Sequence, residues 1–232
     1  MLLPAGRFAI QVAGIADAAD LSAAVEGGAT HVGFPLRLPV HAEDCDDRAA
    51  AALAATLPPG VEAVVITYLE RAEEIAALAR AVGAHTVQLH GEPALDAVVE
   101  LRRVTPGLAL WLALVVGAAP EPLLAERMEW FAPYVDAFVT DTFDPESGAR
   151  GATGRTHDWN VSARLAARSP RPLILAGGLT PENVADAIAA VRPAGVDAHT
   201  GVEDTSGRKD PARVRAFAAA ARVAAAREGI PA

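Results

Sequence analysis

Short apolar segments alternate along this chain with longer segments of helical composition, and each kind of segment occurs eight times. Runs rich in Val, Ile, Leu and Phe are typical of strands buried in a parallel sheet, and Ala/Leu/Glu/Arg-rich segments are typical of covering helices. The predicted strands are Phe8–Ala13, His31–Leu36, Ala63–Tyr68, Thr86–His90, Leu108–Val115, Asp136–Asp141, Leu173–Ala176 and Val196–His199. The predicted helices are Ala18–Gly27, Ala42–Ala55, Arg71–Val82, Ala94–Val104, Glu121–Phe131, Asn160–Ala167, Pro181–Val191 and Asp210–Arg227.

Eight parallel strands joined by helices can close into a barrel, and the connections here are short enough for repeated right-handed βαβ units. The length of 232 residues is close to that of one such barrel. A doubly wound open sheet is the alternative, but it needs a glycine-rich nucleotide loop after its first strand, and Gln11-Val-Ala-Gly14 does not provide one. No linker or repeat divides the chain. We therefore predict an α/β fold with a single-domain (β/α)8 TIM barrel over residues 1–232.

Composition limits the kind of partner. The formal net charge is −9 and no long Lys/Arg run occurs, which argues against nucleic acid or an anionic membrane. No segment has the apolar length of a membrane span, and the first residues lack the basic and apolar regions of a cleaved signal, so we expect a cytoplasmic protein. Cys45 is the only cysteine, which excludes an internal disulfide and a cysteine-based zinc site.

Two strand ends near the C-terminus carry turns of small residues. The segment Pro172–Val184 runs from an apolar strand through Gly177-Gly178 to Thr180-Pro181, a favourable N-cap and first helical residue. The next strand ends at Thr200-Gly201. Backbone N–H groups of adjacent turns can bind one phosphate, as the last two loops of many TIM barrels do. Either turn alone would equally fit an ordinary strand-to-helix connection. Because the two turns follow the last two strands of the predicted barrel, phosphate binding is favoured.

Alternation along the strands predicts which side chains face the barrel interior. In the first strand Phe8, Ile10 and Val12 would pack under the helices, which turns the intervening residues inward. The same parity places a set of polar side chains inside the barrel, toward the rim where barrel active sites lie. They are Gln11, Gln88, His90, Asp141, Asp197 and His199. A polar layer with satisfied hydrogen bonds is the alternative reading of each one taken singly.

Four motifs in this order resemble the phosphoribosylanthranilate isomerase family, barrel enzymes of tryptophan synthesis that perform an Amadori rearrangement on a phosphorylated sugar amine. They are Val87-Gln-Leu-His-Gly91; Thr140-Asp-Thr142 with Gly151-Ala-Thr-Gly-Arg-Thr-His-Asp-Trp159; Ala176-Gly-Gly-Leu-Thr-Pro-Glu-Asn-Val184; and Val196-Asp-Ala-His-Thr-Gly-Val-Glu203 with Lys209-Asp210. The resemblance covers nearly the whole chain. It implies a small-molecule sugar phosphate as substrate, no cofactor and no metal, and a monomer or homodimer.

The resemblance also implies roles for individual residues. Asp141 would be the general acid that protonates the ring oxygen as the furanose opens. The phosphate would be bound by Gly177, Gly178, Thr200 and Gly201, with Gly154 along the phosphoribosyl group and with Gln11, Gln88 and Asp197 as further substrate contacts. Arg37 would hold the aromatic carboxylate of the substrate. The loop around Arg37 is shorter than in the family, so a solvated loop charge is the alternative for this residue.

The first strand departs from the family pattern. The family reads Lys-Ile-Cys-Gly, with the cysteine as general base, whereas this chain has Gln11-Val12-Ala13-Gly14. Alanine cannot accept a proton, and Cys45 is a poor substitute because neighbouring carboxylates disfavour a thiolate. The eighth strand carries His199 where the family has serine, so His199 or His90 would supply a relocated base.

Three functions remain open on the sequence. The first is the isomerase reaction of the family with an altered base. The second is a different reaction on a phosphosugar, such as an aldol-type cleavage, a dehydration or another isomerisation. The third is non-catalytic phosphosugar binding, which the retained Asp141 disfavours because binding alone does not need an acid there.

Overall fold

The eight strands of the computed structural model form one closed barrel, in which each strand pairs in parallel with its neighbours in chain order and β8 pairs with β1. The structure describes residues 8–39, 42–146, 148–151 and 153–231. The N-terminal segment used to argue against a signal lies outside them. The strands are β1 Ala9–Ala13, β2 His31–Leu36, β3 Glu62–Thr67, β4 Thr86–Leu89, β5 Ala109–Val116, β6 Ala137–Thr142, β7 Leu173–Leu175 and β8 Gly195–Ala198.

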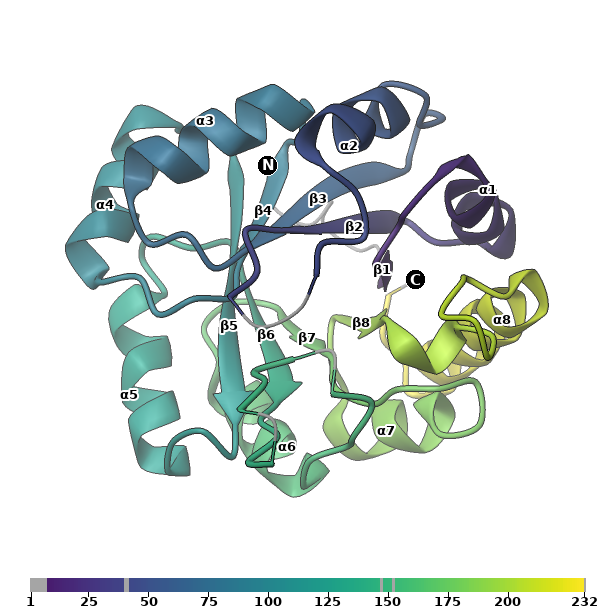
Figure 1. Ribbon diagram of the computed structural model, residues 1–232. Helices are drawn as coiled ribbons and strands as arrows, with labels where there is room; N and C mark the ends of the chain where they lie inside the picture. Colours follow the sequence, from purple (N-terminus) through teal and green to yellow (C-terminus); the bar gives the residue numbers. More distant parts are fainter. Residues whose placement is uncertain (1–7, 40–41, 147, 152, 232) are drawn as a thin grey trace.

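The helices lie around the outside of the barrel (Figure 1). Within the described residues they are α1 Ala18–Gly27, α2 Asp47–Ala54, α3 Ala72–Val82, α4 Leu95–Val104, α5 Glu121–Phe131, α6 Trp159–Arg168, α7 Val184–Val191 and α8 Pro211–Arg227, with a 3₁₀ turn η1 at Thr200–Val202. The TIM-barrel prediction is confirmed, and its elements agree closely with the predicted ranges. Among the described helices, none has the length and apolar character needed to cross a membrane.

Two predicted helix starts were wrong for local reasons. The helix predicted from Ala42 begins at Asp47, because the Asp46 carboxylate accepts a hydrogen bond from the N–H of Ala49 and caps the helix there. The helix predicted from Pro181 begins at Val184. Residues 181–183 form a turn instead, which the side chain of Asn183 holds through the backbone of Thr180 and Gly178.

The core is divided between the inside and the outside of the barrel as the alternation predicts. Ala9 and Ala13 pack inside the barrel with residues such as Trp111 and Ile174. Phe8, Ile10 and Val12 belong to the larger core between strands and helices. Side chains alternate between the two faces along the whole of each strand. Polar residues with the parity of the inward-facing residues therefore lie inside the barrel, at the rim formed by the carboxyl ends of the strands.

Candidate active site

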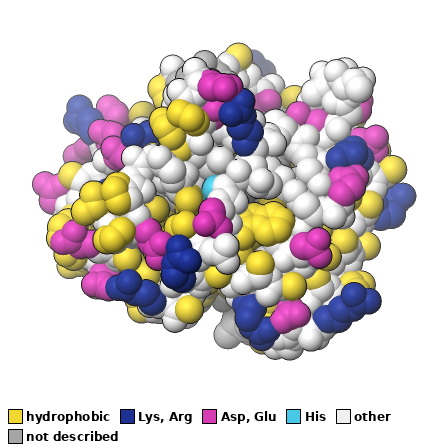
Figure 2. Space-filling model, turned by 90° about the horizontal axis from the view of Figure 1, so that it is seen from below, with side chains coloured by type: hydrophobic (Ala, Val, Ile, Leu, Met, Phe, Trp, Pro, Cys, Tyr) yellow, Lys and Arg dark blue, Asp and Glu magenta, His cyan; other side chains and the backbone are white. Residues whose placement is uncertain are grey.

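Side chains from several strands line a cavity of about 330 Å³ at the carboxyl ends of the strands. Figure 2 shows this face of the molecule, where a histidine side chain is visible in a depression among apolar, acidic and basic groups. We call this space the central cavity. Its walls are formed by Ala13, Pro35, Leu38, Ala42, Asp44, Ile66, Tyr68, Gln88, His90, Asp141, Gly151, Asp197, His199, Thr200, Glu203 and Gly207. The structure thus brings together, from the ends of β4, β6 and β8, five of the six polar residues predicted to face inward; the sixth, Gln11 of β1, hydrogen-bonds to Gln88 without lining the cavity.

Asp141 is held in a defined orientation at the end of β6. Its Oδ1 accepts a hydrogen bond from the N–H of Thr142 at 2.7 Å, and its Oδ2 lies 3.1 Å from Nε2 of His90. The imidazole of His90 is itself stacked on the ring of Tyr68, with centroids 5.2 Å apart. All this leaves both Asp141 and His90 buried against the cavity wall. Such a carboxyl, oriented and largely dry, suits proton transfer to a bound substrate.

Three polar side chains form the floor region: Gln88 and Asp197 line the central cavity, and the buried Gln11 contacts Gln88 without lining it. Nε2 of Gln11 donates to Oε1 of Gln88 at 2.9 Å, so β1 and β4 are joined across the barrel interior. Burial raises the pKa of Asp197 to about 7, and the negative charge of Asp141 adds to this shift. The predicted inward orientation of all three floor residues is confirmed, while their contact with substrate stays a prediction.

A second, smaller cavity adjoins the first at the end of β7. Its walls are Asp141, Gly154, Ala176, Gly177, Gly178, Leu179, Asp197, His199, Thr200 and Gly201. We call it the phosphate cavity, because the predicted phosphate-binding glycines gather there.

Glycine is required at the turn that forms this cavity. Gly177 and Gly178 have φ of +93° and +60°, and a Cβ on Gly178 would lie 2.4 Å from the carbonyl carbon of Arg155. The turn is held by Asn183, whose Nδ2 donates to the carbonyl oxygen of Gly178 at 3.0 Å and whose Oδ1 accepts from the N–H of Thr180 at 2.8 Å. No described residue accepts a hydrogen bond from the N–H of Gly177 or Gly178, which leaves two donors for an anion.

His199 lies beside the position that the family cysteine would occupy. Gln11 and Val12 pair with Asp197 and Ala198, so the next residues along the two strands, Ala13 and His199, are neighbours at the rim. The imidazole covers Gly14 closely enough that a Cβ there would lie 2.1 Å from Nε2.

Two carboxylates accompany this imidazole. Nε2 of His199 is 3.4 Å from Oε1 of Glu203 and 4.0 Å from Oδ2 of Asp44. Glu203 also accepts a hydrogen bond from the fully buried ammonium of Lys209 at 2.6 Å, which fixes its position. A protonated imidazole would therefore be stabilised by its neighbours.

Arg37 is not brought into the central cavity. Its backbone is left-handed, with φ of +61°, and its guanidinium binds both carboxylate oxygens of Asp47 at 2.9 and 2.6 Å. The side chain is 43% exposed and forms a second ion pair with Glu43. The structure therefore favours the alternative of a surface loop charge over the predicted contact with a substrate carboxylate.

Cys45 is also unsuited to the missing role. Partial burial raises the pKa of its thiol to about 11, and the carboxylates of Asp44 and Asp46 add to the shift. It does not line either of the two cavities. This environment agrees with the expectation that Cys45 is a poor substitute for the base.

Sequence reasoning overlooked several side chains of the site. Tyr68 shares strand parity with the inward Val64 and Ile66, so alternation alone could have placed it at the rim. Asp44 and Glu203 come from loops, where no periodicity indicates direction. Their place beside His199 depends on how two distant loops fold over the barrel.

Comparisons with known proteins agree with this geometry. The family model for N-(5'-phosphoribosyl)anthranilate (PRA) isomerase matches residues 10–220. The chain is 37% identical to N-(5'-phosphoribosyl)anthranilate isomerase 2 of Methanosarcina mazei, covering 90% of this chain and 91% of that protein. It is 39% identical to the isomerase of Haloferax volcanii, covering 93% of each.

Solved structures lead to the same assignment. Phosphoribosyl anthranilate isomerase from Thermotoga maritima superposes with a TM-score of 0.79 at 31% identity, covering 94% of this chain and all of that one. A phosphoribosyl anthranilate isomerase in complex with reduced 1-(o-carboxyphenylamino)-1-deoxyribulose 5-phosphate gives a TM-score of 0.76 at 27% identity, with the same coverage. Of the three functions left open, these relatives favour the isomerase. The chain belongs to the phosphoribosylanthranilate isomerase family.

Proposed function

We propose that this isomerase converts N-(5'-phosphoribosyl)anthranilate by an Amadori rearrangement, with Asp141 as general acid and His199 as a general base moved from β1 to β8. The observation that carries the proposal is the position of Asp141, which borders both the phosphate cavity and the central cavity. A substrate whose phosphate lies at Gly177 and Gly178 would therefore extend its sugar past this carboxyl.

Ring opening is the first step. The amine nitrogen shares its lone pair with C1 as the bond from C1 to the ring oxygen breaks, and Asp141 delivers a proton to that oxygen. His90 holds Oδ2 of Asp141 at 3.1 Å and so directs the carboxyl toward the cavity. The product of this step is an open-chain iminium ion.

Removal of a proton from C2 is the second step, and it needs a base. The electrons of the broken C2–H bond form a C1–C2 double bond and neutralise the iminium nitrogen. The resulting enolamine becomes the ketone when C1 gains a proton and the C2 hydroxyl loses one. His199 is placed for this task because it borders both cavities next to Ala13, and because Glu203 and Asp44 stabilise the imidazolium that forms.

Substitutions of the two residues test the proposal. We expect Asp141→Asn and His199→Ser each to lower kcat for PRA isomerisation by about 10²-fold or more, as loss of a proton-transferring group commonly does. His85→Ser, at an exposed position, serves as the control and should retain activity. Adding Ala13→Cys to His199→Ser should restore part of the rate, because it returns a thiol to the neighbouring strand position.

The outcomes separate function from mechanism. A wild-type protein that does not isomerise PRA would contradict the function. Full activity in His199→Ser, with an inactive Asp141→Asn, would contradict only the assignment of the base, which would then lie at His90 or on the substrate itself.

A further inference from the structure

The central cavity is poorly suited to the carboxylate of the substrate's aromatic ring. Asp44, Asp141, Asp197 and Glu203 contribute carboxyl groups to its walls, and none of the described residues that line it is an arginine or lysine. A planar carboxylate is best held by a guanidinium, which can donate two parallel hydrogen bonds. Since Arg37 is paired with Asp47 outside this cavity, the cation must come from elsewhere.

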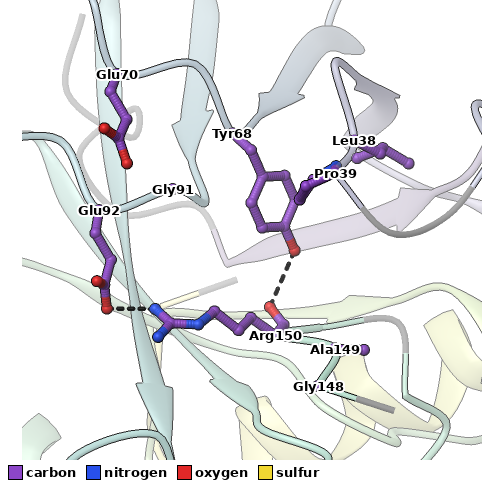
Figure 3. A pocket seen from close by; sticks show the side chains of 9 residues that line it. All are labelled: Leu38, Pro39, Tyr68, Glu70, Gly91, Glu92, Gly148, Ala149 and Arg150. Carbon is purple, nitrogen blue, oxygen red and sulfur yellow. Dashed lines mark hydrogen bonds and ion pairs between the residues drawn. The ribbon is translucent and has the colours of Figure 1, made fainter.

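A neighbouring cavity of about 350 Å³ contains such a cation (Figure 3). We call it the outer cavity. It shares Leu38 and Tyr68 with the central cavity, so these two side chains stand between the spaces. Leu38, Pro39 and the ring of Tyr68 provide apolar surface, and Arg150 is the only lysine or arginine among the lining residues that the structure describes. Its size lies within the usual range of small-molecule sites.

Arg150 is anchored so that its backbone and side chain have separate partners. The hydroxyl of Tyr68 donates to the carbonyl oxygen of Arg150 at 3.2 Å, and residue 150 also forms a β-bridge with Phe143. The guanidinium reaches across the cavity and binds Glu92 through Nη1, as Figure 3 shows. Among the described residues no other hydrogen-bond partner holds this group, so Nε and Nη2 can serve a ligand.

The three cavities adjoin one another in the same order as the phosphate, the sugar and the aromatic ring of the substrate. The phosphate cavity shares Asp141 and His199 with the central cavity, which in turn shares Tyr68 with the outer cavity. We propose that the outer cavity binds the aromatic ring of the substrate against Tyr68, Leu38 and Pro39, and that Arg150 binds its carboxylate in place of Arg37. This inference rests on the proposed function and names the specificity-determining residue of that same site.

Binding of a stable ligand tests Arg150 separately from catalysis. The probe is reduced 1-(o-carboxyphenylamino)-1-deoxyribulose 5-phosphate, compared with the same compound carrying phenylamino in place of o-carboxyphenylamino. Titration calorimetry on the wild type should show tighter binding of the carboxylated compound. Arg150→Gln should lower the affinity for the carboxylated compound by about tenfold and leave the affinity for the phenyl compound unchanged, because only the charge-assisted bonds to the carboxylate are lost.

Two further variants distinguish recognition from structure. Arg150→Lys keeps the positive charge without the paired donors of a guanidinium. Its affinity for the carboxylated compound should lie between those of the wild type and Arg150→Gln. Arg164→Gln removes an exposed arginine that is likewise paired with a glutamate, Glu121, and should bind both compounds as the wild type does.

The inference is overturned if Arg150→Gln binds the carboxylated compound as tightly as the wild type does, or if it lowers the affinity for both compounds equally. It is also overturned if the wild type does not prefer the carboxylated compound. Turnover of PRA by the wild type is measured independently, so an active enzyme with any of these results would retain the proposed function and lose only the assigned role of Arg150.

Discussion

At the residue scale, the site depends on which polar groups are charged. Asp197 is a buried carboxyl on the floor of the central cavity, within the electrostatic influence of Asp141. Its hydrogen-bonding environment includes Gln11, where the family has a lysine. A lysine would offer a compensating positive charge, whereas the amide leaves the carboxyl with a pKa of about 7. The change at Gln11 therefore affects the electrostatics of the floor as well as its shape.

This environment predicts a pH dependence of stability. The pKa of Asp197 is raised from its ordinary 3.8 to about 7, so between these values the unfolded chain has lost a proton that the folded chain retains. The contribution of Asp197 to stability therefore decreases as the pH rises through this window, by up to about 1.4 kcal/mol per pH unit. Asp197→Asn lacks the titration, so its stability relative to the wild type should increase with pH. Urea unfolding of both proteins from about pH 4 to about pH 8 measures this, and parallel profiles would contradict it.

At the element scale, turns after the strands shape the site more than the strands do. The seventh strand ends in a turn whose two glycines have positive φ, and the turn is closed by the side chain of Asn183 rather than by an N-cap at Thr180. The helix α7 consequently begins three residues later than Pro181. Both glycines of this turn line the phosphate cavity, and no described residue accepts a hydrogen bond from their N–H groups.

Asn183→Ala should therefore weaken phosphate binding. The substitution removes the hydrogen bonds to Gly178 and Thr180, each of which stabilises the turn by about 1 kcal/mol. We expect the affinity for ribose 5-phosphate to fall by about fivefold or more, as measured by titration calorimetry. Asn160→Ala is the control, since the side chain of Asn160 bonds only the exposed Asp158 at the start of α6 among the described residues. Equal affinities for the two variants would show that the turn does not need Asn183.

At the scale of the whole molecule, the barrel is closed by contacts between its first and last units. Asp20 of α1 is buried, and its Oδ1 accepts hydrogen bonds from Nε of Arg208 at 3.0 Å and from the N–H of Lys209 at 3.1 Å. Its Oδ2 accepts from the N–H of Ala16 at 3.1 Å. The same segment carries Lys209, which holds Glu203 beside His199. Closure of the barrel and construction of the site are thus coupled.

Asp20→Ala should destabilise the whole barrel. It removes the acceptor of the buried N–H of Lys209 and of two partly buried donors, the N–H of Ala16 and Nε of Arg208, a change that costs about 3 kcal/mol. Asp96→Ala, at an exposed position in the first turn of α4, should lower the free energy of unfolding by only about 0.5 kcal/mol. Denaturant unfolding of the two variants and the wild type provides the comparison. Similar losses for both variants would contradict the role of Asp20 in closing the barrel.

The architecture and the residues of the rim could be predicted from short stretches of the chain. Eight strand-and-helix units follow from hydrophobic periodicity, which depends on local backbone geometry and needs no knowledge of distant contacts. The same periodicity turned Gln11, Gln88 and Asp197 inward, and the glycine pair after the seventh strand indicated a turn whose backbone N–H groups can approach an anion. These features are properties of short segments, so the residues within each segment suffice to predict them.

How the loops complete the site depends on contacts between elements and could not be predicted from local patterns. His199 lies next to Ala13 because of the register between β8 and β1, which no local pattern specifies. Arg37 turns away to Asp47, and Arg150 reaches the outer cavity from the loop after β6, because each loop settles against partners far along the chain or on a neighbouring element. Loop conformation reflects the sum of such contacts rather than periodicity, which is why the proposed choice of His199 over His90 as the base, and the proposed carboxylate site, rest on the folded molecule.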